Sequence, residues 1–99
     1  MSYHYGFQKF ELALKDLVEA GDIQSRVRAA VSQHLLHLDA GTDIPESIQE
    51  NFSTLRNELN LNDAGSHHLA DLLEQKSEQE LQKIAQSIVD MFIKMHRPQ

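Results

Sequence analysis

Apolar residues recur every three or four positions along most of this 99-residue chain, and that spacing constrains the fold more than any other feature. It is the period of an amphipathic α-helix, whose apolar stripe faces the protein core. No segment of the sequence has the alternating pattern of a β-strand. We therefore expect one all-α domain spanning residues 1–99, built as a small antiparallel bundle of four main helices.

Two helices are predicted in the first 40 residues. The first covers about residues 3–20, with Val18 in its apolar stripe. Gly21 ends it, because glycine readily adopts the left-handed conformation found at helix C-termini. Asp22 is suited to N-cap the second helix, because its carboxylate can accept hydrogen bonds from free backbone N–H groups. The very short link between the two helices predicts an antiparallel hairpin.

The third helix is expected to begin near Asp43 or Ile44, with Pro45 in its first turn, where the missing N–H costs nothing. Its narrow apolar stripe predicts a peripheral helix with one buried side. Residues 60–66 are rich in Asn, Asp and Gly, and are expected to form a loop.

A short extra helix over residues 67–75 is expected before the last one. Ser77 and Glu80 match the capping-box pattern, which predicts that the last helix begins there and runs to about Met95. Apolar residues occupy about half of the circumference of this helix or more, wider than the stripe of a surface helix. We therefore expect it to pack centrally, against at least two neighbours or a second chain.

Composition excludes several classes of site and partner. The chain has no cysteine, which excludes disulfides, thiolate zinc sites and cysteine nucleophiles. The net charge is −6, and residues 41–80 carry nine acidic side chains against two basic ones. Clustered positive charge is lacking, so binding to nucleic acid or an anionic membrane is not expected. There is no pattern of a secretory signal or membrane span, which predicts a cytoplasmic protein.

Six histidines raise the question of a metal site. His34 and His37 are three residues apart on a predicted helix, close enough to share a metal ion. At about 100° per residue, however, His34 projects into the centre of the apolar face, and His37 lies at its edge. We therefore predict no metal and no other cofactor, with a site at His34 and His37 as the weaker alternative. His34 is expected to be a neutral core residue, hydrogen-bonded to a backbone carbonyl or a tyrosine.

Arg28 and His34 form a second pattern. An arginine and a histidine a few residues apart on a helix resemble the motif of the HEPN family of helical ribonucleases, in which the pair sits at a dimer cleft. The resemblance implies a nuclease-like enzyme with these two residues at its site. Against it, Arg28 projects about 120° around the helix from His34, and the acidic chain suits an RNA substrate badly. We therefore expect no catalytic residues, and interpret Arg28 as a solvent-exposed residue beside the apolar face of its helix.

A few apolar residues point away from the expected core. On the first helix these are Tyr5 and Leu12, on the second Leu36, and the wide face of the last helix adds Met91 and Ile93. Exposed apolar area tends to mark interaction sites. We therefore expect a non-enzymatic protein-interaction or regulatory module, which self-associates or binds a protein partner through some of these residues. The alternative is a histidine-dependent metal-binding protein or a helical nuclease-like enzyme.

Overall fold

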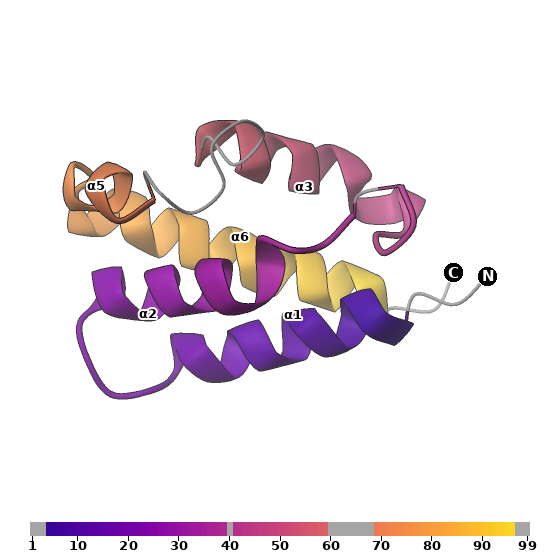
Figure 1. The fold of residues 1–99 in the computed structure, drawn as a ribbon, viewed down its shortest axis with the longest axis horizontal. Helices are drawn as coiled ribbons and strands as arrows, with labels where there is room; N and C mark the ends of the chain where they lie inside the picture. Colours follow the sequence, from indigo (N-terminus) through magenta and orange to yellow (C-terminus); the bar gives the residue numbers. More distant parts are fainter. Residues whose placement is uncertain (1–3, 40, 60–68, 97–99) are drawn as a thin grey trace.

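The structure, a computed structural model, describes residues 4–39, 41–59 and 69–96, and all regular secondary structure in these ranges is helical. The prediction of a small all-α bundle with a short helix before the last one is confirmed. The predicted loop at 60–66 lies outside the described residues. The elements, in chain order, are α1 (His4–Leu17), α2 (Ile23–Ala30), the π-helical η1 (Val31–Leu35), α3 (Glu46–Glu58), α5 (Leu69–Glu74) and α6 (Glu78–His96) (Figure 1).

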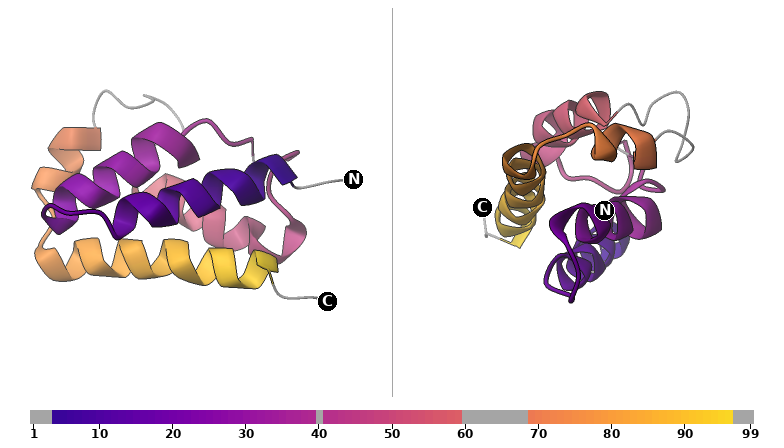
Figure 2. Two further views of the ribbon diagram at one scale, coloured as in Figure 1. Left: turned by 90° about the horizontal axis from the view of Figure 1, so that it is seen from below. Right: turned by 90° about the vertical axis from the view of Figure 1, so that its left-hand side faces the viewer.

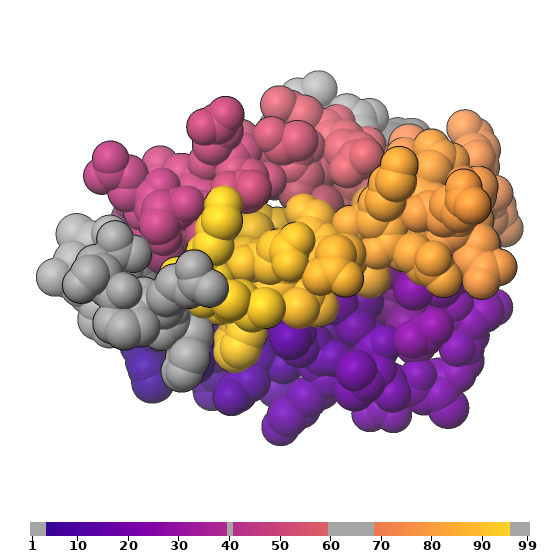
Figure 3. Space-filling view, turned by 180° about the vertical axis from the view of Figure 1, so that it is seen from behind, coloured from indigo at the N-terminus to yellow at the C-terminus, as the bar shows by residue number. Residues whose placement is uncertain are grey.

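Helix α6 occupies the central position that its wide apolar face predicts. It contacts α1, α2 and α3. Seen from behind, it lies between the α1–α2 hairpin on one side and α3 on the other (Figure 3). Helices α1 and α2 run antiparallel, as the short link between them predicts, and η1 continues α2 along α1 (Figure 2). The core therefore forms where the hairpin, α3 and α6 meet.

The core is made of aliphatic and phenylalanine side chains. Among the described residues, none of the buried side chains is polar or charged. Two phenylalanines link distant helices, because Phe10 of α1 and Phe52 of α3 have ring centroids 6.2 Å apart. The predicted stripe of α3 is confirmed, since the following residues are all buried: Ile44, Ile48, Phe52, Leu55 and Leu59.

The start of α3 differs from the prediction. The helix begins at Glu46, and Pro45 is its N-cap residue, with an extended ψ of 155°, instead of lying in the first turn. The carbonyl of Pro45 accepts a hydrogen bond from the N–H of Ile48 at 3.1 Å. Proline is therefore accommodated just before the helix, where its lack of an N–H is equally harmless.

The end of α1 also differs, and the prediction that Val18 belongs to the core stripe is wrong. The helix stops at Leu17, and Val18 is 82% exposed. Arg26 of α2 donates a hydrogen bond from Nη1 to the carbonyl oxygen of Leu17 at 2.8 Å. This side chain satisfies a carbonyl that a longer α1 would have bonded within the helix. Gly21 follows with φ = 120°, which lets the chain reverse into α2.

Both predicted N-terminal caps are confirmed. The N–H of Ser25 donates to Asp22 Oδ1 at 2.8 Å. At the start of α6, the N–H of Ser77 donates to Glu80 Oε1 at 2.8 Å, and the N–H of Glu80 donates to Ser77 Oγ at 3.1 Å. The hydrogen bond from the Ser25 backbone is the main cause that lowers the pKa of Asp22. The Ser77 backbone lowers the pKa of Glu80 in the same way.

We expect acid to weaken these caps. A carboxylate with a lowered pKa in the folded state stabilises the protein above its ordinary pKa of about 4, and this contribution is lost as the pH falls through the lowered value. Asp22→Ala is therefore expected to lower the Tm by a few degrees near neutral pH. The difference from the wild type should shrink in acid. Thermal unfolding followed by circular dichroism over a series of pH values measures it.

The control for this experiment is Gln82→Ala, at an exposed, uncharged position on α6. It should change the Tm little, and by the same amount at every pH. If the difference in Tm between the wild type and Asp22→Ala stayed constant down to strongly acidic pH, the charge of Asp22 would not contribute to the cap.

Candidate functional site

A histidine and a carboxylate meet between the two arms of the hairpin. Asp16 lies in the last turn of α1 and His34 lies in η1. His34 Nε2 is 2.8 Å from Asp16 Oδ2, and the two side chains are 15% and 22% exposed. Within the described structure, the other imidazole nitrogen, Nδ1, is buried and has no hydrogen-bond partner. This is the polar contact that most resembles a reactive arrangement, and Asp16 carries no sequence signal for it.

The predicted environment of His34 is wrong. The imidazole does not occupy the centre of the apolar face, and its partner is neither a backbone carbonyl nor a tyrosine. Leu35 is the residue that enters the core, with 1% of its surface exposed. The cause is the π-helical geometry of η1, which changes the phase of the helix at these two residues.

The pair between Asp16 and His34 is poorly placed for acid–base catalysis. A histidine base oriented by a carboxylate must offer its second nitrogen to the substrate. Here Nδ1 is shielded from solvent. The contact therefore ties η1 to α1 and does not expose a reactive nitrogen.

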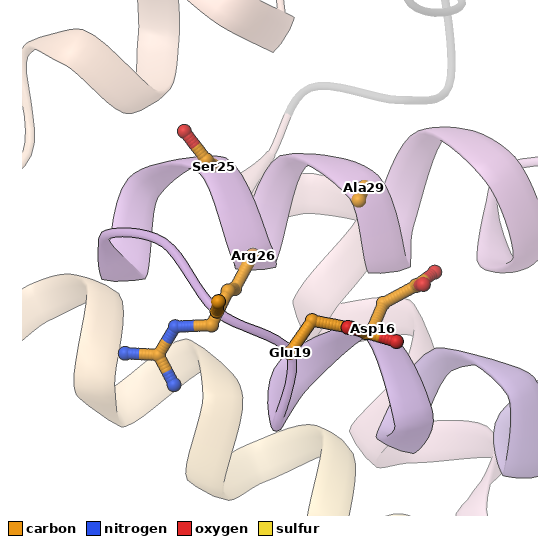
Figure 4. A pocket seen from close by; sticks show the side chains of 6 residues that line it. Asp16, Glu19, Ser25, Arg26 and Ala29 are labelled. Atoms are coloured by element: carbon orange, nitrogen blue, oxygen red, sulfur yellow. The ribbon is translucent and has the colours of Figure 1, made fainter.

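A small hollow of about 110 Å³ lies beside Asp16. Asp16 contributes a carboxylate from α1 and Glu19 one from the turn that follows, and the guanidinium of Arg26 is directed away from both (Figure 4). Pockets that bind small organic ligands usually measure about 300–1,000 Å³. The hollow is therefore too small for such a ligand.

A larger hollow of about 320 Å³ is lined by Ser25, Arg28, Ala29, Ser32 and Gln33. All five belong to α2 and η1, so it is a depression along one helical face and not a cleft between elements. Arg28 lines it, whereas His34 turns toward Asp16. The structure therefore does not bring Arg28 and His34 together as the ribonuclease resemblance would require.

The two histidines suggested as metal ligands lie in different environments. His37 is exposed, and His34 contacts Asp16. In the described ranges, no group of three or more histidine, aspartate or glutamate side chains could hold a metal ion. His67 and His68 lie outside those ranges.

The five interface candidates fall into three environments. Tyr5 and Ile93 are 48% and 47% exposed. Leu12 and Leu36 are partly buried, and Leu36 packs against the core. Met91 is fully buried and belongs to the core. Tyr5 and Ile93 are thus the two candidates that offer a large apolar surface to another molecule, and Met91 offers none.

Tyr5 and Ile93 lie at the same end of the bundle. The N-terminal end of α1 and the C-terminal end of α6 are neighbours (Figures 1 and 2). Phe7 and Phe92 connect them, with stacked rings whose centroids are 5.0 Å apart. We refer to the end of the bundle that carries Tyr5, Phe7, Phe92 and Ile93 as the end surface; on it, Tyr5 projects about 160° around α1 from Phe7. The Phe7–Phe92 contact has no direct signal in the sequence, because it depends on how the two helices pack.

Charged side chains border the end surface. Lys9 Nζ lies 5.4 Å from the centre of the Tyr5 ring. Beside Ile93, Asp90 and Lys94 are both exposed on α6. An apolar centre with a polar rim is the usual composition of a protein–protein interface.

No protein-family profile, curated protein or solved structure matches this chain. None of the helices in the described ranges combines the length and the apolar character needed to cross a membrane.

Proposed function

We propose that this chain is a non-enzymatic protein-interaction module that self-associates through the end surface. The observation that carries the proposal is the half-exposure of Tyr5 and Ile93 at the end where α1 and α6 are joined by the Phe7–Phe92 stack. Aromatic and large aliphatic side chains of this kind supply much of the binding energy in interfaces. We place the module in the cytoplasm on the sequence evidence alone.

The remaining features of the molecule support a binding role over a catalytic one. Catalysis needs reactive groups that converge on a pocket able to hold a substrate. The hollow beside Asp16 is small, and the free nitrogen of His34 is shielded. An interface needs only surface, and the end surface provides it on regular helices.

Self-association should be lost when charge is placed on the end surface. We expect Tyr5→Glu combined with Ile93→Glu to shift the wild-type protein from a concentration-dependent oligomer to a monomer. Each substitution buries a carboxylate in the interface, which is unfavourable without a partner charge. Size-exclusion chromatography with light scattering over a range of concentrations measures the change.

The matched control is Val18→Glu, because Val18 is an exposed apolar residue in the turn at the opposite end of α1. It should leave the oligomeric state unchanged. A wild-type protein that remains a monomer at every concentration would contradict self-association. If the double variant and the wild type also captured the same proteins from a cell extract, the end surface would have no binding role.

A further inference from the structure

The helix that starts at Ile23 changes its hydrogen-bond pattern at Val31. Helix α2 ends at Ala30, and η1 follows without a break in the backbone (Figure 1). The N–H of Leu36 donates to the carbonyl oxygen of Val31 at 2.8 Å. This bond spans five residues, whereas an α-helix would join Leu36 to Ser32. The turn therefore contains one more residue than a turn of α-helix.

The extra residue decides which side chain enters the core. In an uninterrupted α-helix, His34 would lie near the middle of the face formed by Val27, Ala30, Val31 and Leu38, and Leu35 would lie beyond its edge. Those four apolar residues are buried in the structure. Leu35 is buried beside them, while His34 is displaced to the flank that faces α1. The π turn exchanges the positions of the two side chains.

Residues 31–36 could follow either an α-helical or a π-helical hydrogen-bond pattern, here called the α register and the π register. The two registers place the imidazole of His34 in different environments. In the α register the imidazole would face an apolar core, where removing its nitrogens from water without partners is unfavourable. In the observed register Nε2 lies 2.8 Å from Asp16 Oδ2, although neither that oxygen nor Nδ1 has a hydrogen-bond partner among the described residues. The residues after η1 form turns, including a bond of 3.3 Å from the N–H of Leu38 to the carbonyl of Leu35. These turns can accommodate the change in backbone direction that follows when residues 31–36 go from one register to the other.

We propose that residues 31–36 form a two-register switch whose setting depends on the contact between His34 and Asp16. The π register is held by this contact and by burial of Leu35. The α register becomes the stable one when residue 34 is apolar, and gains population when Asp16 can no longer bind the imidazole. The switch is independent of the proposed function, because neither residue belongs to the end surface.

Through-hydrogen-bond scalar couplings measured by NMR distinguish the registers. In the wild type, the amide nitrogen of Leu36 should couple to the carbonyl carbon of Val31. In His34→Leu it should couple to that of Ser32, and the Tm should rise because the variant no longer shields an imidazole nitrogen that has no hydrogen-bond partner. The matched control, His37→Leu, replaces an exposed histidine in the same segment and should keep the coupling to Val31.

A second variant tests the contact without changing the core residue. Asp16→Ala keeps His34, and is expected to weaken the coupling between Leu36 and Val31 relative to the wild type and to lower the Tm. A coupling to Val31 that persists at full strength in both His34→Leu and Asp16→Ala would overturn the proposal. A coupling to Ser32 in the wild type would overturn it as well.

Discussion

Phe52→Ala is expected to lower the free energy of unfolding by about 3–5 kcal/mol, the usual cost of truncating a buried phenylalanine. Phe52 is 1% exposed and pairs with Phe10 across the bundle. Helix α3 is held by a single stripe, so few other contacts can compensate for the cavity. A domain of this size is stabilised by only about 5–15 kcal/mol. The variant should therefore unfold at a much lower urea concentration, as followed by circular dichroism.

Ser53→Ala is the matched control for this experiment, because Ser53 is the neighbouring residue and is exposed. It should change the stability by less than about 0.5 kcal/mol. A loss below about 1 kcal/mol for Phe52→Ala would mean that α3 is not docked on the bundle as described.

Gly6→Ala is expected to lower the free energy of unfolding by about 1–3 kcal/mol, the range for forcing an extra group into a packed site. In an exposed helix the same change would stabilise the protein by about 0.5–1 kcal/mol. Here the new methyl group would overlap the carbonyl oxygen of Asp43, a backbone atom. Urea denaturation measures the loss.

The loop that contains Asp43 is poorly able to retreat from such a methyl group. The N–H of Asp43 donates to the carbonyl of Asp39 at 2.8 Å, and the N–H of Asp39 donates to Asp43 Oδ2 at 2.9 Å. Gln8→Ala, at an exposed position of the same helix, is the control and should be nearly neutral. A Gly6→Ala protein as stable as the wild type would mean that α1 and this loop are farther apart than described.

The features that the sequence predicted correctly are those governed by local signals. Asp22 and the pair Ser77 and Glu80 act within a few residues, so their roles as caps could be recognised without knowing the fold. The stripe of α3 was equally clear, because one side of that helix is buried and the other is polar.

The features that were missed depend on packing between helices. The spacing of Val18 fits the stripe and predicts a core position, but α1 ends at Leu17, where Arg26 donates a hydrogen bond to the Leu17 carbonyl. The sequence predicts Met91 at the surface because α6 is apolar on more than one side, and only the positions of its neighbours decide which side is covered. A constant period of about 100° per residue predicts His34 in the core, because it cannot anticipate a π turn.

The central place of α6 has a consequence for the order in which the bundle can be built. During synthesis, the hairpin and α3 leave the ribosome before the helix that touches both. Until that helix arrives, the contact between Phe10 and Phe52 can join α1 to α3, but the apolar surface that α6 covers on both remains open to solvent. Nascent chains that have reached residue 59 should therefore be exposed to chaperones and proteases, and cooperative folding should begin only after residues 78–96 have emerged.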